Sequence, residues 1–397
     1  MKILMVSKAL PTSYPGGTQT HTVNLSHALG ARGHEVTILT ASGSLTNRRA
    51  YRIGEHITIQ PVFYVPGRLG VLRLHTIDDA TFALSVLRFL KRHAGEFDIV
   101  HLQGRSGALF AGDRTRRKTP CVVTFHGHLR SEHAAAISTG TIGPKLRCEM
   151  ACAAGYASAH ERRMARHADG VIAVSGSMLE TVTSDIAPLH QPHAVIPNGV
   201  NAGDFMPAPH RTVPLRIVSV SRLDPLKGHT YLLAAAAKLM PLVPGLTLHI
   251  VGEGPQRPLL ERMMSDLHLE GVVTLTGALR GQALLDELQQ AELFVLPSLR
   301  ETQGIAFMEA LLCGVPVVGF DIPGVDEVLA NGNTATLVPL RDEAALTRAI
   351  GDALLDADSY AAMAARGRTH ILERFQWPAI AQRTEQFYHT VIEKHYA

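Results

Sequence analysis

The chain of 397 residues carries 38 basic and 35 acidic side chains, and 46% of its residues are hydrophobic. This length favours two domains with ample core volume, and this composition excludes a disordered chain, collagen and a coiled coil. The formal charge of +3 excludes a global field that would gather nucleic acid, so no nucleic-acid partner is expected.

The cysteines and the apolar runs predict a cytoplasmic protein that does not span a membrane. Four cysteines make no disulfide framework in a chain of this length, which favours free thiols and a reducing compartment. The opening run Ile3–Val6 is too short for a signal peptide and predicts a first strand. The richest apolar stretch, Leu232–Leu242, is broken by Lys238 and Pro241. Peripheral contact with the inner membrane face stays compatible with these features.

Short β-branched runs alternate with helical patterns along the chain, which is typical of βα units on a parallel sheet. The first set of predicted strands is Lys2–Ser7, Glu35–Thr40, Ile57–Pro61, Asp98–Leu102, Cys121–Phe125, Gly170–Val174 and Ala194–Pro197. A segment rich in Pro, Asn and Gly, residues 197–214, then predicts a domain linker. The second set of predicted strands is Leu215–Val220, Leu246–Val251, Val272–Leu275, Leu293–Pro297 and Pro316–Phe320. We therefore expect two doubly wound sheets in tandem, with ligands at the carboxyl ends of strands.

The region 128–166 is helical in pattern and mixes basic residues with apolar ones. A solvated helix face explains this mixture, and a surface for an acidic or lipid-linked acceptor is the alternative.

Several common catalytic motifs are missing from the sequence. No G-x-G-x-x-G follows the first predicted strand, and the segment Gly252–Arg257 lacks the third glycine. The sequence also contains no Walker-type loop, no H-E-x-x-H and no G-x-S-x-G. Dinucleotide oxidoreductases, P-loop enzymes, zincins and serine hydrolases are therefore disfavoured. The turn Gly252–Pro255 is predicted to end with a proline that opens a helix.

Two loops at predicted strand ends suit a phosphate group. Gly16 and Gly17 follow the first strand and precede a helical pattern beginning near Gln19, although an ordinary turn explains them equally well. In the second half, Arg222 and Lys227 leave the end of one strand together. An arginine fork and a lysine point charge suit a diphosphate, whereas the plain alternative is a pair of surface charges.

The segment from Pro297 to Val318 has the most specific pattern in the chain. A strand ends at Pro297, Glu301 lies in the loop, Gly304 opens a helix, and Glu309 lies inside that helix. Free amides at the helix start are able to receive phosphate or sugar oxygens, and the two carboxylates accept hydrogen bonds from hydroxyl groups.

Taken together, these segments resemble the retaining nucleotide-sugar glycosyltransferases of glycosyltransferase family 4, which have the GT-B fold. The motifs that carry the resemblance lie in family order between residue 3 and about residue 330. They are Gly16-Gly17, Thr124-Phe125-His126-Gly127, Val174-Ser175, Ile196–Val200, Arg222 with Lys227-Gly228, Gly252–Pro255, and Glu301–Glu309 with Cys313–Val318. The segment Arg374–Trp377 and the final helical stretch resemble the family's C-terminal segment.

The resemblance implies an α/β architecture of two tandem Rossmann-like domains, each a doubly wound parallel sheet, facing a central cleft. Residues 1–205 would form the acceptor-binding domain and residues 206–376 the domain that binds the nucleotide-sugar donor. Residues 377–397 would form a helix that returns to the N-terminal domain.

The resemblance also implies roles for single residues. The expected catalytic set is His126, Glu301, Arg222 and Lys227. Arg222 and Lys227 would bind the donor diphosphate, Glu301 would face the C3 hydroxyl of the transferred sugar, and His126 would lie at that sugar. The expected donor-binding set adds Gly16, Gly17, Gly252, Gly304, Ile305, Ala306 and Glu309, of which Glu309 would accept from the ribose hydroxyls. Gln303 occupies a position where many family members carry an aromatic residue. We interpret it as a subfamily difference that affects the choice of donor and does not abolish activity.

We expect no cofactor and no metal, because cations and helix-end dipoles can stabilise the departing nucleotide diphosphate. A rival hypothesis makes His126, His128 and His133 metal ligands, because they lie close together in the sequence. Asp326 and Glu327 after Gly324 are explained equally well as an acidic first turn of a helix.

The expected reaction moves a hexose-type sugar from a nucleotide diphosphate, UDP first and GDP second, to an acceptor hydroxyl with retention. Same-face attack is favoured. A glycan, a lipid-linked intermediate and a small natural product all fit as acceptors, with contacts from the loops 13–17, 66–75 and 126–138. The alternatives are a sugar-nucleotide 2-epimerase, a phosphorylase, and a non-catalytic sugar-nucleotide binding protein of the same architecture.

Overall fold

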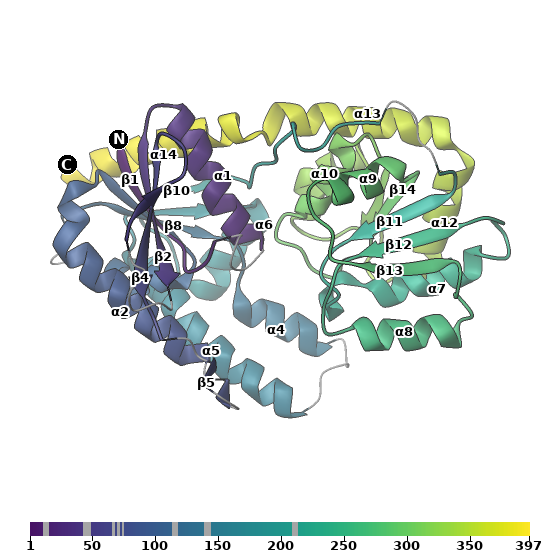
Figure 1. The fold of residues 1–397 in the computed structure, drawn as a ribbon, viewed down its shortest axis with the longest axis horizontal. Coiled ribbons are helices and arrows are strands. Elements are labelled where there is room, and N and C mark those ends of the chain that lie inside the picture. Colours follow the sequence, from purple (N-terminus) through teal and green to yellow (C-terminus); the bar gives the residue numbers. More distant parts are fainter. Residues whose placement is uncertain are drawn as a thin grey trace. The chain divides into compact units, whose positions relative to one another are not determined.

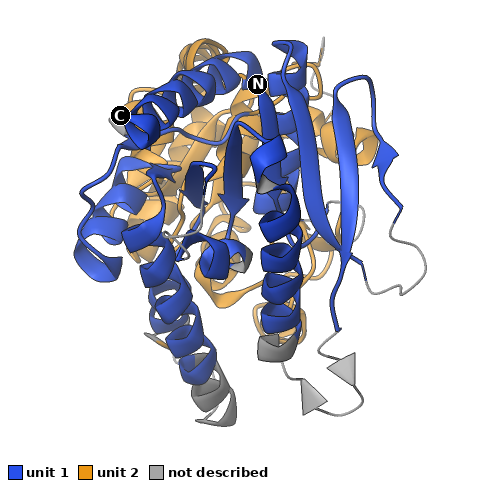
Figure 2. Cartoon of the chain, turned by 90° about the vertical axis from the view of Figure 1, so that its left-hand side faces the viewer, with its two compact units in different colours: residues 1–134, 143–199, 377–397 blue, residues 135–142, 200–376 orange. Residues whose placement is uncertain are grey.

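The computed structural model describes residues 1–10, 16–42, 49–65, 68–69, 72–73, 75–112, 118–138, 144–208 and 213–397. The chain divides into two compact units (Figure 2). Unit 1 comprises residues 1–134, 143–199 and 377–397, and unit 2 comprises residues 135–142 and 200–376.

Unit 1 is built on an eight-stranded sheet in the order β10-β9-β8-β7-β1-β2-β4-β3, parallel except for the edge strand β3. Its strands are β1 Lys2–Val6, β2 Glu35–Ser42, β3 Tyr51–Arg52, β4 Ile57–Phe63, β7 Ile99–Gln103, β8 Cys121–Phe125, β9 Gly170–Ala173 and β10 His193–Val195. The short strands β5 Arg68–Leu69 and β6 Leu72–Arg73 pair antiparallel as a separate hairpin.

Helices lie between these strands and after them in the chain (Figure 1). They are α1 Gly17–Ala31, α2 His75–His93, α3 Ala108–Ala111, α4 Leu129–Ser138, α5 Pro144–His167, α6 Gly176–Thr181, the π-turn Val182–Ile186 and α14 Trp377–Tyr396. Short 3₁₀ turns cover Ala94–Glu96 and Arg105–Gly107.

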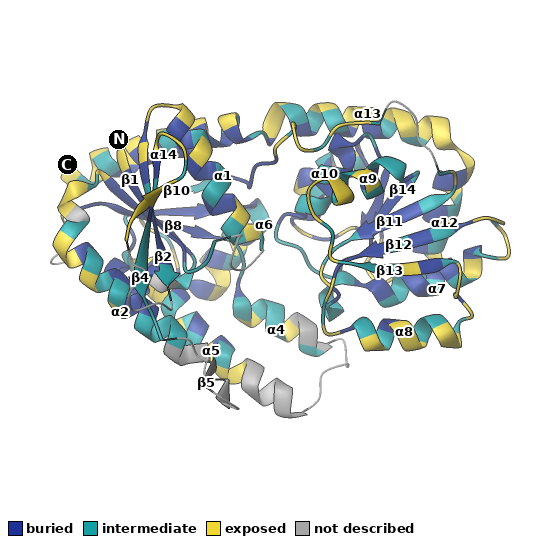
Figure 3. Ribbon diagram, in the orientation of Figure 1, coloured by how far each residue is buried: buried dark blue, intermediate teal, exposed yellow. Residues whose placement is uncertain are grey.

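The central strands of unit 1 are apolar on both sides because helices cover both faces of the sheet. Leu4 and Val6 of β1 belong to one core, whereas Ile3 and Met5 belong to the other. The second core includes Ile380 and Tyr388 of α14, so the C-terminal helix covers this face of the sheet. Figure 3 shows the resulting pattern, with buried strands and exposed outer helix surfaces.

Unit 2 contains a six-stranded sheet in the order β13-β12-β11-β14-β15-β16, with every pair parallel. Its strands are β11 Arg216–Val220, β12 Thr247–Val251, β13 Val273–Gly277, β14 Leu293–Leu296, β15 Val317–Phe320 and β16 Thr336–Val338. Its helices are α7 His229–Leu239, α8 Arg257–Asp266, α9 Gln282–Gln290, α10 Ile305–Leu312, α11 Val325–Val328, α12 Glu343–Leu355 and α13 Ala357–Arg374. One core of buried residues contacts this sheet and its helices.

The predicted fold class, two tandem doubly wound parallel sheets, is confirmed. Strand β16 was not predicted, because only three residues pair there and no alternating pattern marks them. The prediction that Pro255 opens a helix is wrong, since α8 begins at Arg257 and Pro258 occupies its first turn. Gly324 does precede α11, whose first turn carries Asp326 and Glu327. Within the described part of the chain, no helix combines the length and apolar character needed to cross a bilayer.

Candidate active site

The loop after β11 presents two basic side chains at the carboxyl end of that strand. Asp224 accepts a hydrogen bond from the Leu226 amide at 2.9 Å and thereby caps the 3₁₀ turn Pro225–Lys227. The Arg222 side chain is 69% exposed, with one guanidinium nitrogen 3.6 Å from the Asp224 carboxylate. Such a weak, exposed contact leaves the guanidinium available to an anionic ligand.

Lys227 is turned toward the loop that follows β14, the neighbouring strand. Its Nζ lies 2.6 Å from Oε1 of Glu301, and the Ser298 hydroxyl donates to the same oxygen at 2.9 Å. Both charged side chains are partly buried, which strengthens their interaction relative to one in open solvent. The structure therefore brings together two of the predicted site residues, one from each loop.

The two loops fit closely because a glycine lies between them. Gly228 has a φ of 67°, and a Cβ on it would lie 1.9 Å from the Pro297 carbonyl oxygen. The Leu299 amide donates to the Leu226 carbonyl at 2.8 Å, which ties the loops together. Only glycine satisfies both the backbone conformation and the close approach.

Gly252 follows β12 and lies against the other side of the β11 loop. A Cβ on Gly252 would lie 1.8 Å from the Ser221 carbonyl oxygen, and the Leu223 amide donates to the Glu253 carbonyl at 3.0 Å. Gly252 and Glu253 therefore support the backbone before and after Arg222. This contact is a structural reason for glycine at this position, whether or not a donor also lies near it.

Helix α10 begins at the same edge of the sheet. Gly304 is its N-cap, with a φ of 75°, and Ile305 and Ala306 are its first residues. The first amides of a helix have no partner within it and attract anions. The neighbouring Gln303 is buried.

Glu309 lies in the middle of α10 and is partly buried. Burial raises the pKa of its carboxyl to about 7, and the carboxylate of Asp204 adds to the increase. A fixed, poorly hydrated carboxylate is a strong acceptor for hydroxyl groups once it is ionised.

In unit 1, His126 directly follows β8 and is half-buried. Its Nε2 lies 2.7 Å from Oε1 of Gln103, at the end of the adjacent strand β7. Its ring also meets the edge of the His21 ring, with centroids 4.6 Å apart. His21 belongs to α1, whose N-cap is Gly16 and whose first residue is Gly17, so the start of this helix and His126 occupy one region.

The histidines around His126 are neutral at physiological pH. Burial lowers the pKa of His126 to about 4 and that of His101 to about 3. Burial also lowers the pKa of His21 well below its usual value, with like charge on His126 and His101 adding to the effect. His126 therefore acts as a hydrogen-bonding group rather than as a cation.

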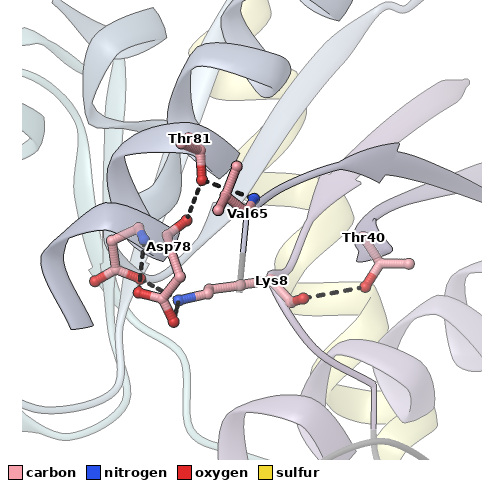
Figure 4. A network of polar contacts seen from close by, with 6 residues as sticks. Lys8, Thr40, Val65, Asp78 and Thr81 are labelled. Atoms are coloured by element: carbon pink, nitrogen blue, oxygen red, sulfur yellow. Dashed lines mark hydrogen bonds and ion pairs between the residues drawn. The ribbon is translucent and has the colours of Figure 1, made fainter. Parts of the chain in front are cut away.

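A group of charged residues missed by the sequence analysis lies after β1 (Figure 4). The Lys8 ammonium contacts Asp79 at 2.5 Å and Asp78 at 3.0 Å, both carboxylates coming from α2. Burial opposes the charge of Lys8, but the two carboxylates outweigh it and raise its pKa. The sequence places Lys8 directly after the first predicted strand, which was the only indication of a functional role. Its contacts with Asp78 and Asp79 of α2 depend on the fold and could not be predicted from the sequence.

A second charged cluster follows β7 and β8. Glu161 of α5 is buried, with one oxygen 3.8 Å from Arg105 and the other 3.5 Å from His128. Burial raises the pKa of Glu161 to about 7, although Arg105 opposes the increase. The expected acceptor loops also include residues 13–15, 66–67, 70–71 and 74, which lie outside the described residues.

The structure gives His126 and His128, two of the histidines in the rival metal hypothesis, separate hydrogen-bond partners. His128 Nδ1 lies 2.6 Å from the Ser131 hydroxyl, while His126 contacts Gln103. Among the described residues, no group of three or more His, Cys, Asp or Glu side chains is arranged to hold a metal ion.

Comparison with known proteins identifies the family. Residues 15–204 match the family model described as "Glycosyltransferase Family 4", and residues 206–370 match the one described as "Glycosyl transferases group 1". The chain is 29% identical to a glycogen synthase of Mycobacterium tuberculosis, over 98% of this chain and 94% of that protein. It is 34% identical to a GDP-mannose-dependent alpha-(1-6)-phosphatidylinositol monomannoside mannosyltransferase of Mycolicibacterium smegmatis, over 54% of this chain and 61% of that protein.

Solved structures show the same fold. Sucrose-phosphate synthase of Thermosynechococcus elongatus superposes with a TM-score of 0.81 at 21% identity, covering 99% of both chains. HepE of Anabaena, solved with UDP and glucose, gives a TM-score of 0.74 at 20% identity, covering 97% of this chain and 98% of that one. The two family matches together span nearly all of the chain. The chain therefore belongs to glycosyltransferase family 4, whose members are retaining, generally metal-independent hexosyltransferases of the GT-B fold that use nucleotide-sugar donors.

Proposed function

We propose that this enzyme transfers a hexose-type sugar from a nucleotide diphosphate to an acceptor hydroxyl in polysaccharide, glycolipid or natural-product biosynthesis. The observation that carries the proposal is the Lys227–Glu301 pair beside exposed Arg222, at the carboxyl ends of β11 and β14. This is the edge of a doubly wound sheet at which such folds bind ligands.

The donor diphosphate lies against Arg222 and Lys227 in this proposal. Their charges, with the first amides of α10 at Ile305 and Ala306, stabilise the negative charge that develops on the leaving group. A nucleotide diphosphate is already a weak base, so the reaction proceeds without a metal and without an acid. The departing phosphate oxygen takes the acceptor proton during attack on the same face of the sugar.

Glu309 and Glu301 bind different parts of the donor. Glu309 accepts from the ribose hydroxyls, most strongly in its ionised form. Glu301 accepts from the C3 hydroxyl of the transferred sugar, and neutral His126 binds the same sugar. Gly16 and Gly17 approach the phosphates. Gly252 holds the Arg222 loop beside the nucleotide.

UDP is the first choice for the nucleotide and GDP the second. UDP is supported by the UDP-bound relative of the same fold, and GDP by the mannosyltransferase relative that is GDP-mannose-dependent. Neither relative determines which nucleotide base this chain binds. The first relative is similar in fold alone, and the second matches only about half of the chain.

The acceptor hydroxyl belongs in unit 1, near the charged cluster of Lys8, Asp78 and Asp79 (Figure 4). Half-buried carboxylates accept hydrogen bonds from polyhydroxylated molecules, so a glycan, a lipid-linked sugar or a glycosylated natural product fits this cluster. We place the enzyme in the cytoplasm. Exposed Arg162 and Arg166 of α5 would support peripheral contact with the inner membrane face.

The decisive experiment measures donor binding and turnover separately. Thermal unfolding with UDP, GDP and ADP should show a raised midpoint for one nucleotide, because only a ligand of the folded state stabilises it. With the matching nucleotide sugars and a panel of acceptor glycans and polyols, release of that nucleotide should depend on the acceptor. A raised midpoint without acceptor-dependent release from any donor would contradict the proposed reaction.

A further inference from the structure

A chain of buried hydrogen bonds joins His126 to helix α14 within unit 1. His126 Nε2 lies 2.7 Å from Oε1 of Gln103, and Nε2 of Gln103 lies 3.2 Å from Nε2 of His101. His101 Nδ1 then lies 2.6 Å from the Tyr388 hydroxyl. Gln103, His101 and Tyr388 are all buried. A polar chain of this length inside an apolar core is costly unless every member is paired.

The strand register explains why these residues meet. His101 and Gln103 are two residues apart on β7 and therefore share one face of the sheet. Gln103 pairs with Thr124 of β8, and His126 lies two residues beyond Thr124 on the same side. This is the face that α14 covers, which brings the Tyr388 hydroxyl to the inner end of the chain.

The hydrogen bond to Gln103 selects one tautomer of His126. An amide oxygen only accepts, so the proton of neutral His126 must be on Nε2 and its Nδ1 is bare. The amide nitrogen of Gln103 only donates, and it lies 3.2 Å from Nε2 and 3.5 Å from Nδ1 of His101, so it contacts this ring without selecting its tautomer. The Thr124 hydroxyl lies 2.6 Å from His101 Nε2, and the Tyr388 hydroxyl lies 2.6 Å from Nδ1; each hydroxyl can donate or accept.

In the part of the chain that the structure describes, the groups that act on His126 are His21 from α1, His101 from β7, Gln103 and the side chain of Asn198, and none of these is a carboxylate. Burial lowers the pKa of His126 to about 4, so this histidine stays neutral across the physiological range. In a neutral imidazole, the position of the single proton decides what each nitrogen can bind.

We propose that Gln103 is the positioning residue for His126: it holds the imidazole as the Nε2–H tautomer, and its own amide is oriented by His101 and Tyr388. The proposal rests on the proposed function, in which His126 binds the transferred sugar. A bare Nδ1 can only accept a hydrogen bond, so a misplaced proton would remove this acceptor and change the orientation of the ring. Gln103 does not touch the sugar.

The tautomer is measurable without any activity. Nitrogen-15 NMR of histidine-labelled protein should show His126, identified by its loss in His126→Gln, protonated on Nε2 between pH 6 and 8. In Gln103→Leu the same resonances should move toward a mixture of the two tautomers. A wild-type His126 protonated on Nδ1 would overturn the proposal, because Gln103 would then be donating rather than accepting.

Kinetics test the consequence for catalysis. Gln103→Leu should lower kcat by about 10- to 100-fold with the donor KM changed by less than about threefold, as for a reacting group that is misoriented. Gln60→Leu on β4 of the same sheet is the matched control and should leave kcat unchanged. Equal kcat values in the two variants would overturn the proposal.

The variant Gln103→Glu separates positioning from a packing defect. A carboxylate facing His126 Nε2 raises the pKa of the imidazole, so part of the population becomes charged near neutral pH. The ratio of the kcat of Gln103→Glu to that of the wild type should therefore rise from pH 6 to pH 8.5. A constant ratio would mean that Gln103 is structural. If no donor is turned over at all, the proposed function fails, whereas the NMR measurement still decides the tautomer.

Discussion

Lys227 and Glu301 come from loops after neighbouring strands, and their side chains form an ion pair with Nζ 2.6 Å from Oε1. In the proposed mechanism one of these residues binds the donor diphosphate and the other the transferred sugar. The carboxylate holds the ammonium in place before a donor arrives, so less ordering is needed on binding. The pair therefore links phosphate binding to sugar binding.

Removing either cation should weaken transfer strongly. Arg222→Ala and Lys227→Ala should each lower kcat/KM by about 30- to 1000-fold, corresponding to ~2–4 kcal/mol for one preorganised charge contact in the transition state. Initial rates of nucleotide release at varied donor concentration measure this. Lys238→Ala removes a cation that is paired with Glu343 on the surface of the same unit and should change kcat/KM less than twofold. Similar losses in all three variants would contradict the assignment.

The two glutamates should differ in the kinetic constant they affect. Glu301→Ala should lower kcat more than it weakens nucleotide binding, because the carboxylate faces the reacting sugar as well as holding Lys227 in place. Glu309→Ala should instead weaken nucleotide binding, because its partner is the ribose. Calorimetric titration of the nucleotide and steady-state kinetics measure the two effects, and the reverse pattern would mean that the two roles are exchanged.

The fold could be predicted because parallel strands buried on both faces leave near-continuous apolar runs, such as Cys121–Phe125. Strand β16 could not be predicted, because three paired residues give no period. Gly304 was predictable as a helix start from its place after a strand and before the apolar run of α10. The proline of α8 was misassigned because Pro255 and Pro258 both precede an apolar helical pattern.

The sequence predicted single residues of the candidate site but not the contacts between them. Arg222, Lys227 and His126 were chosen because each follows a predicted strand. The residues that they contact depend on which strands are neighbours in the sheet. Glu301 meets Lys227 because β14 lies beside β11, and Gln103 meets His126 because β7 lies beside β8. The order of strands in a sheet cannot be inferred from local sequence patterns, so these two contacts could be found only in the structure.

Nucleotide binding should depend on pH through Glu309. Burial raises the pKa of this carboxyl to about 7, and the ionised form is the stronger acceptor for the two ribose hydroxyls. Affinity should therefore rise as the pH increases from 6 to 8 and become level above that. Glu309→Gln should bind more weakly at pH 8 and lose this pH dependence. Calorimetric titration at several pH values measures both.

Glu261→Gln is the control for that measurement, because Glu261 is an exposed acid on α8 of the same unit. It should keep the wild-type pH dependence. An affinity that falls with rising pH, or a Glu309→Gln variant that retains the wild-type profile, would contradict the role of the Glu309 carboxylate.

The transfer reaction should not require a divalent ion, because Arg222, Lys227 and the start of α10 supply the positive charge. Extensive treatment with EDTA should leave the rate of acceptor-dependent nucleotide release within about twofold of the untreated value. Loss of activity that one divalent ion restores would contradict this mechanism and revive the histidine metal hypothesis.

The contact between the β11 and β14 loops should respond to a single added methyl group. Gly228→Ala introduces a Cβ 1.9 Å from the Pro297 carbonyl oxygen at a φ of 67°, so the loops must separate. Gly271 also has a positive φ, 83°, but a Cβ added there would have no neighbour within 4 Å. Gly271→Ala should therefore destabilise the fold only through the backbone conformation, by about 1–2 kcal/mol. Gly228→Ala should lower the thermal midpoint further and also weaken nucleotide binding, which Gly271→Ala should preserve. Equal effects of the two variants on binding would show that the loop contact does not position Lys227.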